Sequence, residues 1–560
     1  MKTQQFSWIK TIGYGLLVLI ITMAISHWDK QWDLTPDQRY TLNPMVFELT
    51  QNLDEPIVVT SYLEGQIPAS FRNYKDYIDY FLSEIRRRDR NVIIEYRNPV
   101  EGDDSVEFRR FLSSQGVEPI RRQVTSTEEV NSNLLYPYLS VNNSRQIVFI
   151  NLLEPLLGGQ GEEESLVESQ LAFEGKFLRG LKQIVRKRSP EVHVLGYRPD
   201  LMAEGFNRDP SLDAYRFVPS DGGSLLENKD SLDAVLVILK GEDLRRNELL
   251  AVDVLAGFGK PVTWLIDKFD ITLDSLRHSG NHLAVAKEFN VEDYLFKMGL
   301  KIQPNLVMDL QASRIPQVVN DGSSTPQYRM MQYPFHPLLL PGELAPPVTK
   351  LSAPLSLYYV SAIETSEFPK TIEKTTLLTT SPYTRIRTSP VTVNFGFMQV
   401  TPDPMDYQEG NIPLCVELKG RTQPYYTNRI TSEDKQFLSE FNLEYSADSQ
   451  YIQQVVISDA DFIIPAQGPD GRLYPIGYNP AERQMYQANT QLLGNILEYL
   501  IDGDEILALA NRTSDLTILD KQRYDASRNR YLVISLVLPL VLLLLSYLFY
   551  HWWRKRRYAS

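Results

Sequence analysis

Two long apolar segments, one near each end of the chain, constrain its architecture more than any other feature. Residues 11–28 and residues 531–553 carry no formal charge when His27 and His551 are counted as neutral. With a rise of about 1.5 Å per residue, a helix of either length can cross a hydrocarbon core about 30 Å thick. Trp552 and Trp553 lie where aromatic side chains commonly meet the membrane surface. The sequence therefore predicts one transmembrane helix at each end.

The charges beside these segments predict their orientation. Lys2 and Lys10 precede the first segment, and four basic residues at 554–557 follow the second. Basic flanks favour the cytoplasmic side, so we expect a two-pass protein of a bacterial inner membrane with both termini in the cytoplasm and a large periplasmic body. Basic residues also precede the second segment, so its own flanks do not decide the orientation. For the first segment, a cleaved signal peptide ending near Ala24-Ile25-Ser26 remains the alternative.

Cysteine count, charge and missing motifs exclude several classes of protein. Cys415 is the single cysteine among 560 residues, which excludes an intramolecular disulfide and a cysteine-rich zinc site. The net charge of −13 argues against a nucleic-acid partner. The nearest string to an ATP-binding phosphate loop, at 257–260, lacks the leading glycine because position 254 is valine. We therefore expect a chain that does not hydrolyse ATP itself and carries no cofactor.

The region 45–155 alternates strand and helix patterns. Apolar runs at 57–63 and 92–96 predict strands, and the intervening apolar spacing predicts a helix that Ser70 caps. A short helix and a hairpin complete the order β-α-β-α-β-β, which resembles a thioredoxin-like domain. The position where such a fold carries its CxxC motif reads EGQIP at 64–68, so redox activity is not expected.

The following region predicts a parallel α/β layer. A flexible glycine-rich joint at 158–161 leads into a helix over 163–188. The nearly continuous apolar runs at 232–239 and 262–266 are typical of buried parallel strands. Between them we expect a helix that Asp243 caps. Strand–helix–strand at this spacing is a parallel crossover and indicates a Rossmann-like domain.

The predicted fold class is therefore α/β, in a membrane-anchored multidomain chain. Beyond about residue 311 the sequence becomes richer in proline and predicts a β-rich elaboration of the second domain. A helix is expected to run from outside into the membrane near the C-terminus. The predicted segments are a cytoplasmic N-terminus with the first transmembrane helix (1–27), a thioredoxin-like domain (45–155), a linker and helix (156–189), an α/β domain with β elaboration (190–510), a juxtamembrane helix (511–530), the second transmembrane helix (531–553) and a basic cytoplasmic tail (554–560).

Several residues of types that often carry chemistry have simpler structural interpretations. Asp267 stands at the end of a predicted strand, where α/β folds bind ligands, but a loop aspartate that caps a turn is the favoured interpretation. Asp459 and Asp461 are expected to cap backbone amides in a turn. His278 and His282 are separated by a helix-breaking Ser-Gly-Asn, so a shared metal site is not expected. We interpret Cys415 as a buried structural thiol in a loop, and predict no catalytic, cofactor-binding or metal residue.

Several longer strings together resemble the GldG family, the gliding-associated auxiliary subunits of ABC transporters in Bacteroidota. They are FGKPVTWLID (258–267), FNVEDYLFKMGLKI (289–302), LVMDLQASRIP (306–316), YPFHPLL (333–339) and SDADFI (458–463). The resemblance implies a central domain related to class I glutamine-amidotransferase-like folds. The turn after 232–239 reads Lys-Gly-Glu-Asp at 240–243 where that fold would carry its catalytic cysteine, so amidotransferase activity is not implied. The family supplies no ligand-binding residues.

The resemblance also implies partners. It predicts a non-catalytic periplasmic subunit that works with a GldF-like permease and a GldA-like ATPase. Inner-membrane lipid and an envelope partner are expected as further contacts. No nucleic-acid partner is expected. The alternative is a ligand- or glycan-binding module tethered to the inner membrane, since the chain has 31 tyrosines and aromatic faces suit sugars.

Overall fold

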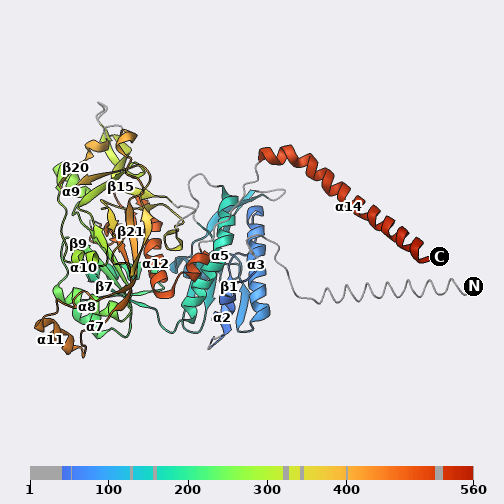
Figure 1. Cartoon of the computed structure of the whole chain (residues 1–560). Helices are drawn as coiled ribbons and strands as arrows, with labels where there is room; N and C mark the ends of the chain where they lie inside the picture. The colour runs from blue at the N-terminus through green and yellow to red at the C-terminus, as the bar shows by residue number, and fades with distance from the viewer. Residues whose placement is uncertain are drawn as a thin grey trace, which may run out of the picture. The chain divides into compact units, whose positions relative to one another are not determined.

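The computed structural model describes residues 41–51, 53, 55–125, 130–154, 161–319, 327–340, 346–398, 402–468, 470–510 and 521–558. The first predicted transmembrane helix lies outside these residues, as does most of the glycine-rich joint at 158–161. The chain divides into two compact units, Met1–Arg512 and Thr513–Ser560. The first unit mixes helices and sheets (Figure 1), which confirms the α/β class.

The N-terminal part of the first unit is built on a four-stranded sheet of order β2-β1-β5-β6. The central strand β1 (Ile57–Ser61) pairs in parallel with β2 (Val92–Tyr96) and antiparallel with β5 (Tyr138–Asn142). Strand β6 (Ile147–Asn151) completes the predicted hairpin with β5. Helix α3 (Ala69–Arg88) connects the two parallel strands, as the apolar spacing predicts. The remaining elements are α2 (Pro44–Gln51), α4 (Ser105–Ser114), and the hairpin of β3 (Ile120–Thr125) and β4 (Val130–Leu135), which the sequence pattern did not predict.

Aromatic side chains join α3 to α5 (Glu162–Val185) over this sheet. The ring of Phe81 meets those of Phe173 and Phe177 edge-on, with centroids 4.9 and 5.3 Å apart. The predicted cap of α3 is wrong: Pro68 occupies the N-cap position, and the Ser70 hydroxyl lies inside the helix and donates to Glu162 at 3.4 Å. Helix α5 also ends earlier than predicted, so the basic run at 186–188 follows the helix.

A seven-stranded sheet of order β18-β21-β22-β10-β9-β7-β8 forms the centre of the remaining part. Five neighbouring strands pair in parallel, and two more join at one edge through antiparallel pairings. The parallel strands are β7 (Glu191–Gly196), β8 (Arg216–Pro219), β9 (Leu232–Lys240), β10 (Val262–Asp267) and β22 (Gln450–Ile457), and the antiparallel ones are β18 (Ile372–Thr379) and β21 (Pro413–Thr422).

Both faces of this sheet are buried, and the side chains of β9 are apolar on both faces. Its even-numbered residues 234, 236 and 238 join one core, and the odd-numbered 235, 237 and 239 join the other. Helices α6 (Pro199–Arg208) and α12 (Gln487–Asp502) contribute to the first core. Helices α7 (Gly222–Glu227), α8 (Arg246–Gly257), α10 (Val291–Lys297) and α11 (Ser432–Glu440) contribute to the second. The continuous apolar run predicted this two-sided burial.

The predicted cap of α8 is also wrong. Arg245 is the N-cap, and the Glu248 side chain returns to accept from the Arg245 backbone N–H at 2.7 Å. Asp243 instead accepts from the backbone N–H of Asn290 at 2.8 Å. Asp243 therefore ties the start of α10 to the loop after β9 rather than capping the helix that follows it.

The β-rich elaboration forms small sheets around a separate core that contains Tyr333 and Phe335. Its elements are α9 (Leu273–Ser279), β11 (Asn281–Ala284), β12 (Leu300–Ile302), β13 (Asn305–Asp309), β14 (Ala312–Val319), β15 (Gln327–Leu339), β16 (Leu355–Ser356), β17 (Ile363–Thr365), β19 (Thr384–Thr388) and β20 (Val391–Asn394). Two short strands, β23 (Tyr478–Asn479) and β24 (Gln484–Met485), precede α12, and α13 (Glu505–Ala510) follows it.

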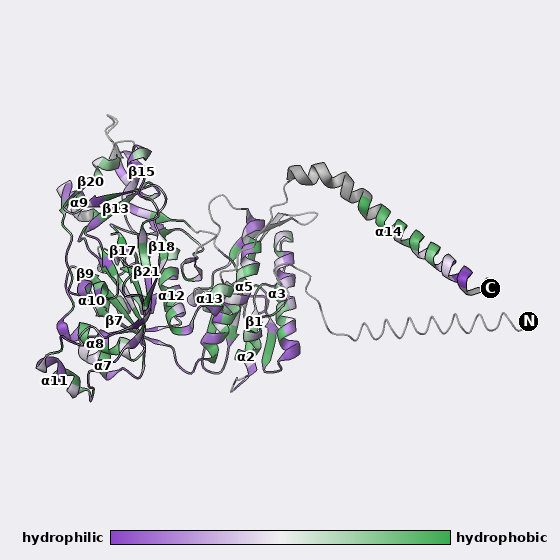
Figure 2. Ribbon diagram, in the orientation of Figure 1, coloured by the Kyte–Doolittle hydropathy of each residue, from purple (hydrophilic) through white to green (hydrophobic). Residues whose placement is uncertain are grey.

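The second unit consists of the long helix α14 (Lys521–Tyr558), which includes the predicted second transmembrane segment. Among the described residues, the stretch Val537–Arg556 of α14 is long and apolar enough to cross a membrane. Figure 2 shows this helix hydrophobic along much of its length and hydrophilic at its C-terminal end. Helix α14 begins at Lys521 and so covers residues 521–530 of the predicted juxtamembrane helix, whereas residues 511–520 lie outside the described residues.

Candidate functional site

Four charged side chains meet at the carboxyl ends of adjacent parallel strands. Lys240 is the last residue of β9 and Asp267 the last of β10, and the two are paired in register. Asp459 and Asp461 follow β22, the next strand in the sheet. Because the carboxyl ends of parallel strands lie at one edge, residues far apart in the chain come together there. We refer to these four residues as the strand-end cluster.

Lys240 holds the strand-end cluster together. Its Nζ lies 3.2 Å from Asp267 Oδ2 and donates a hydrogen bond to Asp461 Oδ1. Asp267 is 2% exposed and Asp459 is 1% exposed. Buried carboxylates are costly unless they are paired, so the lysine offsets a large desolvation penalty.

The aspartates also make the turn contacts that their sequence positions predict. Asp267 Oδ1 accepts from the backbone N–H of Phe269 at 3.1 Å. Asp459 Oδ1 accepts from the backbone N–H of Asp461 at 2.7 Å, and its Oδ2 accepts from that of Tyr358 at 2.8 Å. The interpretation as turn-capping residues is therefore confirmed for Asp267 and Asp459, but it missed the contacts that Asp267 and Asp461 make with Lys240.

Burial shifts the protonation of the strand-end cluster. Burial, followed by the nearby charge of Asp461, raises the pKa of Asp267 to about 7. The same two causes, with Asp267 as a third, raise the pKa of Asp459 well above its usual range. Burial alone would lower the pKa of Lys240, but Asp461 and Asp267 outweigh it and raise that pKa. The lysine is therefore charged, and the cluster holds a proton on a carboxyl near neutral pH.

A buried histidine, His336, contacts the ring of Tyr358, the residue whose backbone N–H donates to Asp459. The rings of His336 and Tyr358 are 4.8 Å apart in edge-on contact, and Tyr333 and Tyr359 make similar contacts with the histidine. Neither ring nitrogen of His336 has a hydrogen-bond partner among the described residues. Burial lowers the pKa of His336 to about 3, so the imidazole is neutral. This histidine belongs to the aromatic core of the β-rich region.

The geometry of the strand-end cluster suits holding the fold together more than exchanging protons with a substrate. Two of its carboxyls are closed off from solvent, and their oxygens already accept from backbone amides. The cluster connects β9, β10 and the turn after β22 through Lys240. Within the described part of the chain, no group of three or more His, Cys, Asp or Glu side chains is arranged to hold a metal ion.

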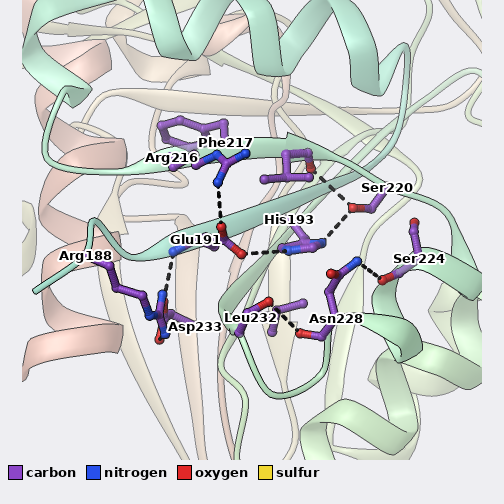
Figure 3. A network of polar contacts seen from close by, with 12 residues as sticks. Arg188, Glu191, His193, Arg216, Phe217, Ser220, Ser224, Asn228, Leu232 and Asp233 are labelled. Carbon is purple, nitrogen blue, oxygen red and sulfur yellow. Dashed lines mark hydrogen bonds and ion pairs between the residues drawn. The ribbon is translucent and has the colours of Figure 1, made fainter.

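A second polar network brings a serine, a histidine and a glutamate together at the edge of the same sheet (Figure 3). His193 Nδ1 lies 2.7 Å from Ser220 Oγ, and its Nε2 lies 3.9 Å from Glu191 Oε2. Ser220 also donates to the carbonyl of Val218 at 3.3 Å, which leaves His193 to donate its Nδ1 proton to the serine. A nucleophilic serine needs the opposite polarity.

Burial is a second difference between this network and a catalytic triad. His193 is 1% exposed, and burial lowers its pKa although Glu191 opposes the effect. Glu191 instead pairs with Arg216 at 3.0 Å across the β7–β8 strand pair. The network therefore connects polar residues of β7 with the edge strand β8 and the residue that follows it. Sequence spacing alone did not reveal it because His193 and Ser220 are 27 residues apart.

The other residues considered from the sequence are not brought together. His278 lies in the last turn of α9 and His282 lies in β11, with Gly280 at φ +73° between them, so the predicted helix break is confirmed. Cys415 lies in β21 and not in a loop, since Pro413–Thr422 pairs with both neighbouring strands. It is fully buried, as expected of a structural thiol, and burial raises its pKa.

Comparisons with known proteins indicate the family to which the chain belongs. A family model described as "ABC-type uncharacterized transport system" (ABC_transp_aux) matches residues 203–496. A second, described as a domain of unknown function (DUF7088), matches residues 36–142. No curated protein matches the chain. The solved structure named "mmIFT52 N-terminal domain" is similar at 10% identity and a TM-score of 0.28, covering 56% of this chain and 98% of that chain. At that TM-score the likeness supports no argument.

The first match spans the α/β layer from residue 203 onward, the strand-end cluster and the β-rich region, and it covers more than half of the 560 residues. The described part of the chain adds a helix, α14, with the length and composition of a membrane span. The chain therefore belongs to the ABC_transp_aux family and is an accessory subunit of an ABC-type transport system.

Proposed function

We propose that the protein is a non-catalytic, membrane-anchored subunit of a gliding motility-associated ABC transporter, acting with a GldF-like permease and a GldA-like ATPase. The family match over residues 203–496 carries the accessory role. The resemblance of the strings at 258–267, 289–302 and 458–463 to GldG supports the assignment to gliding motility. The missing phosphate-loop motif is the reason to assign ATP hydrolysis to a separate subunit.

The proposed topology is two-pass, with both termini in the cytoplasm of a bacterium and the body in the periplasm. The apolar stretch Val537–Arg556 supports an anchor at the C-terminal end. The basic residues at 554–557 favour the cytoplasmic side for the end of that helix, and Lys2 and Lys10 do so for the N-terminus. In this arrangement the body would pass force or substrate between the permease and an envelope partner.

The domain folds proposed for the body have topological support. The order β2-β1-β5-β6, with one parallel and two antiparallel pairings, is the arrangement expected of a thioredoxin-like domain. The parallel strands β7, β8, β9, β10 and β22 with helices on both faces support a Rossmann-like domain. We propose that both serve as scaffold or binding surfaces, and that the strand-end cluster is structural.

Affinity purification tests this proposal. The chain, tagged at its C-terminus and expressed from its own locus, is solubilised from native membranes in mild detergent, with an untagged strain as the control. Mass spectrometry should identify a GldF-like permease and a GldA-like ATPase in the tagged sample alone. A matched variant that ends after residue 510 lacks α14 and should lose both partners if the anchor docks against the permease. Purification of the intact chain without either partner would contradict the proposal.

A further inference from the structure

The C-terminal end of helix α14 carries a dense group of basic side chains. Four consecutive basic residues, at 554–557, follow the apolar part of this helix directly. Helix α14 continues to Tyr558, so these residues stand on a helix and not in an irregular tail. Successive residues of a helix are about 100° apart around its axis, so four of them place positive charge on nearly every side of it. We refer to residues 554–557 as the basic collar.

Helix α14 supplies no negative charge beside the basic collar. The last acidic residue of the sequence is Asp525, and residues 526–560 contain neither aspartate nor glutamate. At 1.5 Å per residue, Asp525 lies about 44 Å along the helix from Arg554. Arg554, Lys555 and Arg556 are exposed. In the proposed topology the acidic body lies on the other side of the membrane, so the counter-charges of the basic collar must come from another molecule.

Two tryptophans place the basic collar at the level of lipid headgroups. Trp552 and Trp553 are exposed on α14 immediately before the collar, and such side chains settle at the interface between hydrocarbon and water. The guanidinium group of Arg556 lies over the ring of Trp552, 4.4 Å from its centroid. This cation–π contact holds Arg556 beside the aromatic belt. The collar therefore begins at the depth where the phosphate groups of a bilayer lie.

The chemistry of these side chains selects an anionic headgroup. A guanidinium group binds phosphate oxygens through two parallel hydrogen bonds, and basic segments next to a membrane helix attract anionic lipids. We propose that the basic collar binds the headgroups of anionic phospholipids, so that α14 gathers these lipids around its cytoplasmic end. This inference rests on the proposed membrane anchor and deepens it, because it names the class of lipid that the anchor prefers.

Spin-labelled lipids test the proposal. The full chain is reconstituted in phosphatidylcholine vesicles that contain a trace of spin-labelled phosphatidylglycerol or, in parallel, spin-labelled phosphatidylcholine. Electron paramagnetic resonance then measures the fraction of each label that is immobilised against the protein. We expect the anionic lipid to be preferred about two- to fivefold, since one basic residue at an anionic surface contributes about fivefold and the signal averages over all boundary lipids. The preference should fall in about 1 M NaCl, which screens such contacts. Equal immobilisation of the two lipids would overturn the proposal.

Two matched variants assign the preference to the basic collar. The first replaces all four residues at 554–557 by glutamine. The control makes the same change in net charge at four exposed basic residues of the body, Arg72, Lys370, Lys435 and Arg472. We expect the collar variant to lose most of the preference and the control to keep it, and an undiminished preference in the collar variant would refute the collar as the site. If neither lipid is immobilised by the unmodified chain, the proposed anchor is contradicted together with this inference.

Discussion

At the scale of single residues, the strand-end cluster shows what sequence patterns can and cannot predict. The position of Asp267 at the end of a strand and the turn around Asp459 follow from local patterns. The contact between Lys240 and Asp461 joins residues 221 positions apart. Such a contact depends on strand order, and nothing in the local sequence near Lys240 indicates which strand lies next to β10.

The raised pKa of Asp267 makes a prediction about stability and pH. Its pKa is about 7 in the folded chain but about 3.9 in an unfolded one. At a pH between these two pKa values, Asp267 keeps its proton in the folded state but has lost it in the unfolded state. This group therefore lowers the free energy of unfolding as the pH rises from about 4 to about 7. We expect Asp267→Asn to flatten that part of the curve, as measured by thermal melts of the full chain. Asp230→Asn, a change at a carboxylate that is 93% exposed, is the control; an unchanged slope in Asp267→Asn would contradict the assignment.

Cys415 provides a second residue-scale prediction. The thiol is fully buried and its pKa is raised by burial, so little thiolate is available to react. A maleimide should label the chain rapidly in denaturant and very slowly in the folded state. Cys415→Ala should cost about 1–2 kcal/mol through a small cavity and leave motility intact. Rapid labelling of the folded chain, or lost motility at normal protein levels, would contradict a structural role.

At the scale of helices and strands, long apolar patterns were predicted well and caps were not. The strands at 232–239 and 262–266 were found because burial on both faces makes them continuously apolar. Ser70 and Asp243 have suitable side chains for caps, but Pro68 and Arg245 occupy the N-cap positions. At Arg245 the capping contact comes from the nearby Glu248 side chain. Strand β8 was missed because four residues give too short a pattern.

Helix α14 leads to a prediction about coupling. If it transmits motion between the membrane and the body, inserting Gly-Ser-Gly-Ser after Ser527 should abolish gliding while the complex still assembles, since each glycine costs about 1 kcal/mol of helix propensity. Inserting four alanines at the same place is the matched control, because it adds equal length and preserves the helix. Normal gliding with the glycine-containing insertion would leave the helix as an anchor only.

At the scale of the whole molecule, membrane topology follows from charge and apolar length. The proposed two-pass arrangement predicts that a protease added outside spheroplasts digests the body but spares a tag at the C-terminus. Immunoblotting of the tag fragment checks this, and disrupting the membrane with detergent should expose the tag as well. Loss of the tag from intact spheroplasts would contradict the proposed orientation of α14. It would mean that the basic residues at 554–557 lie outside the cytoplasm.

The central claim is that this chain works as one subunit of an ABC transport complex. Native mass spectrometry of the complex released from native membranes tests it most directly, because it weighs the assembly and identifies each subunit in one measurement. The account predicts a single assembly that contains the 64.4 kDa chain together with a permease and an ATPase. A chain that is released alone or only as copies of itself, under conditions that keep the permease and ATPase together, would contradict the account.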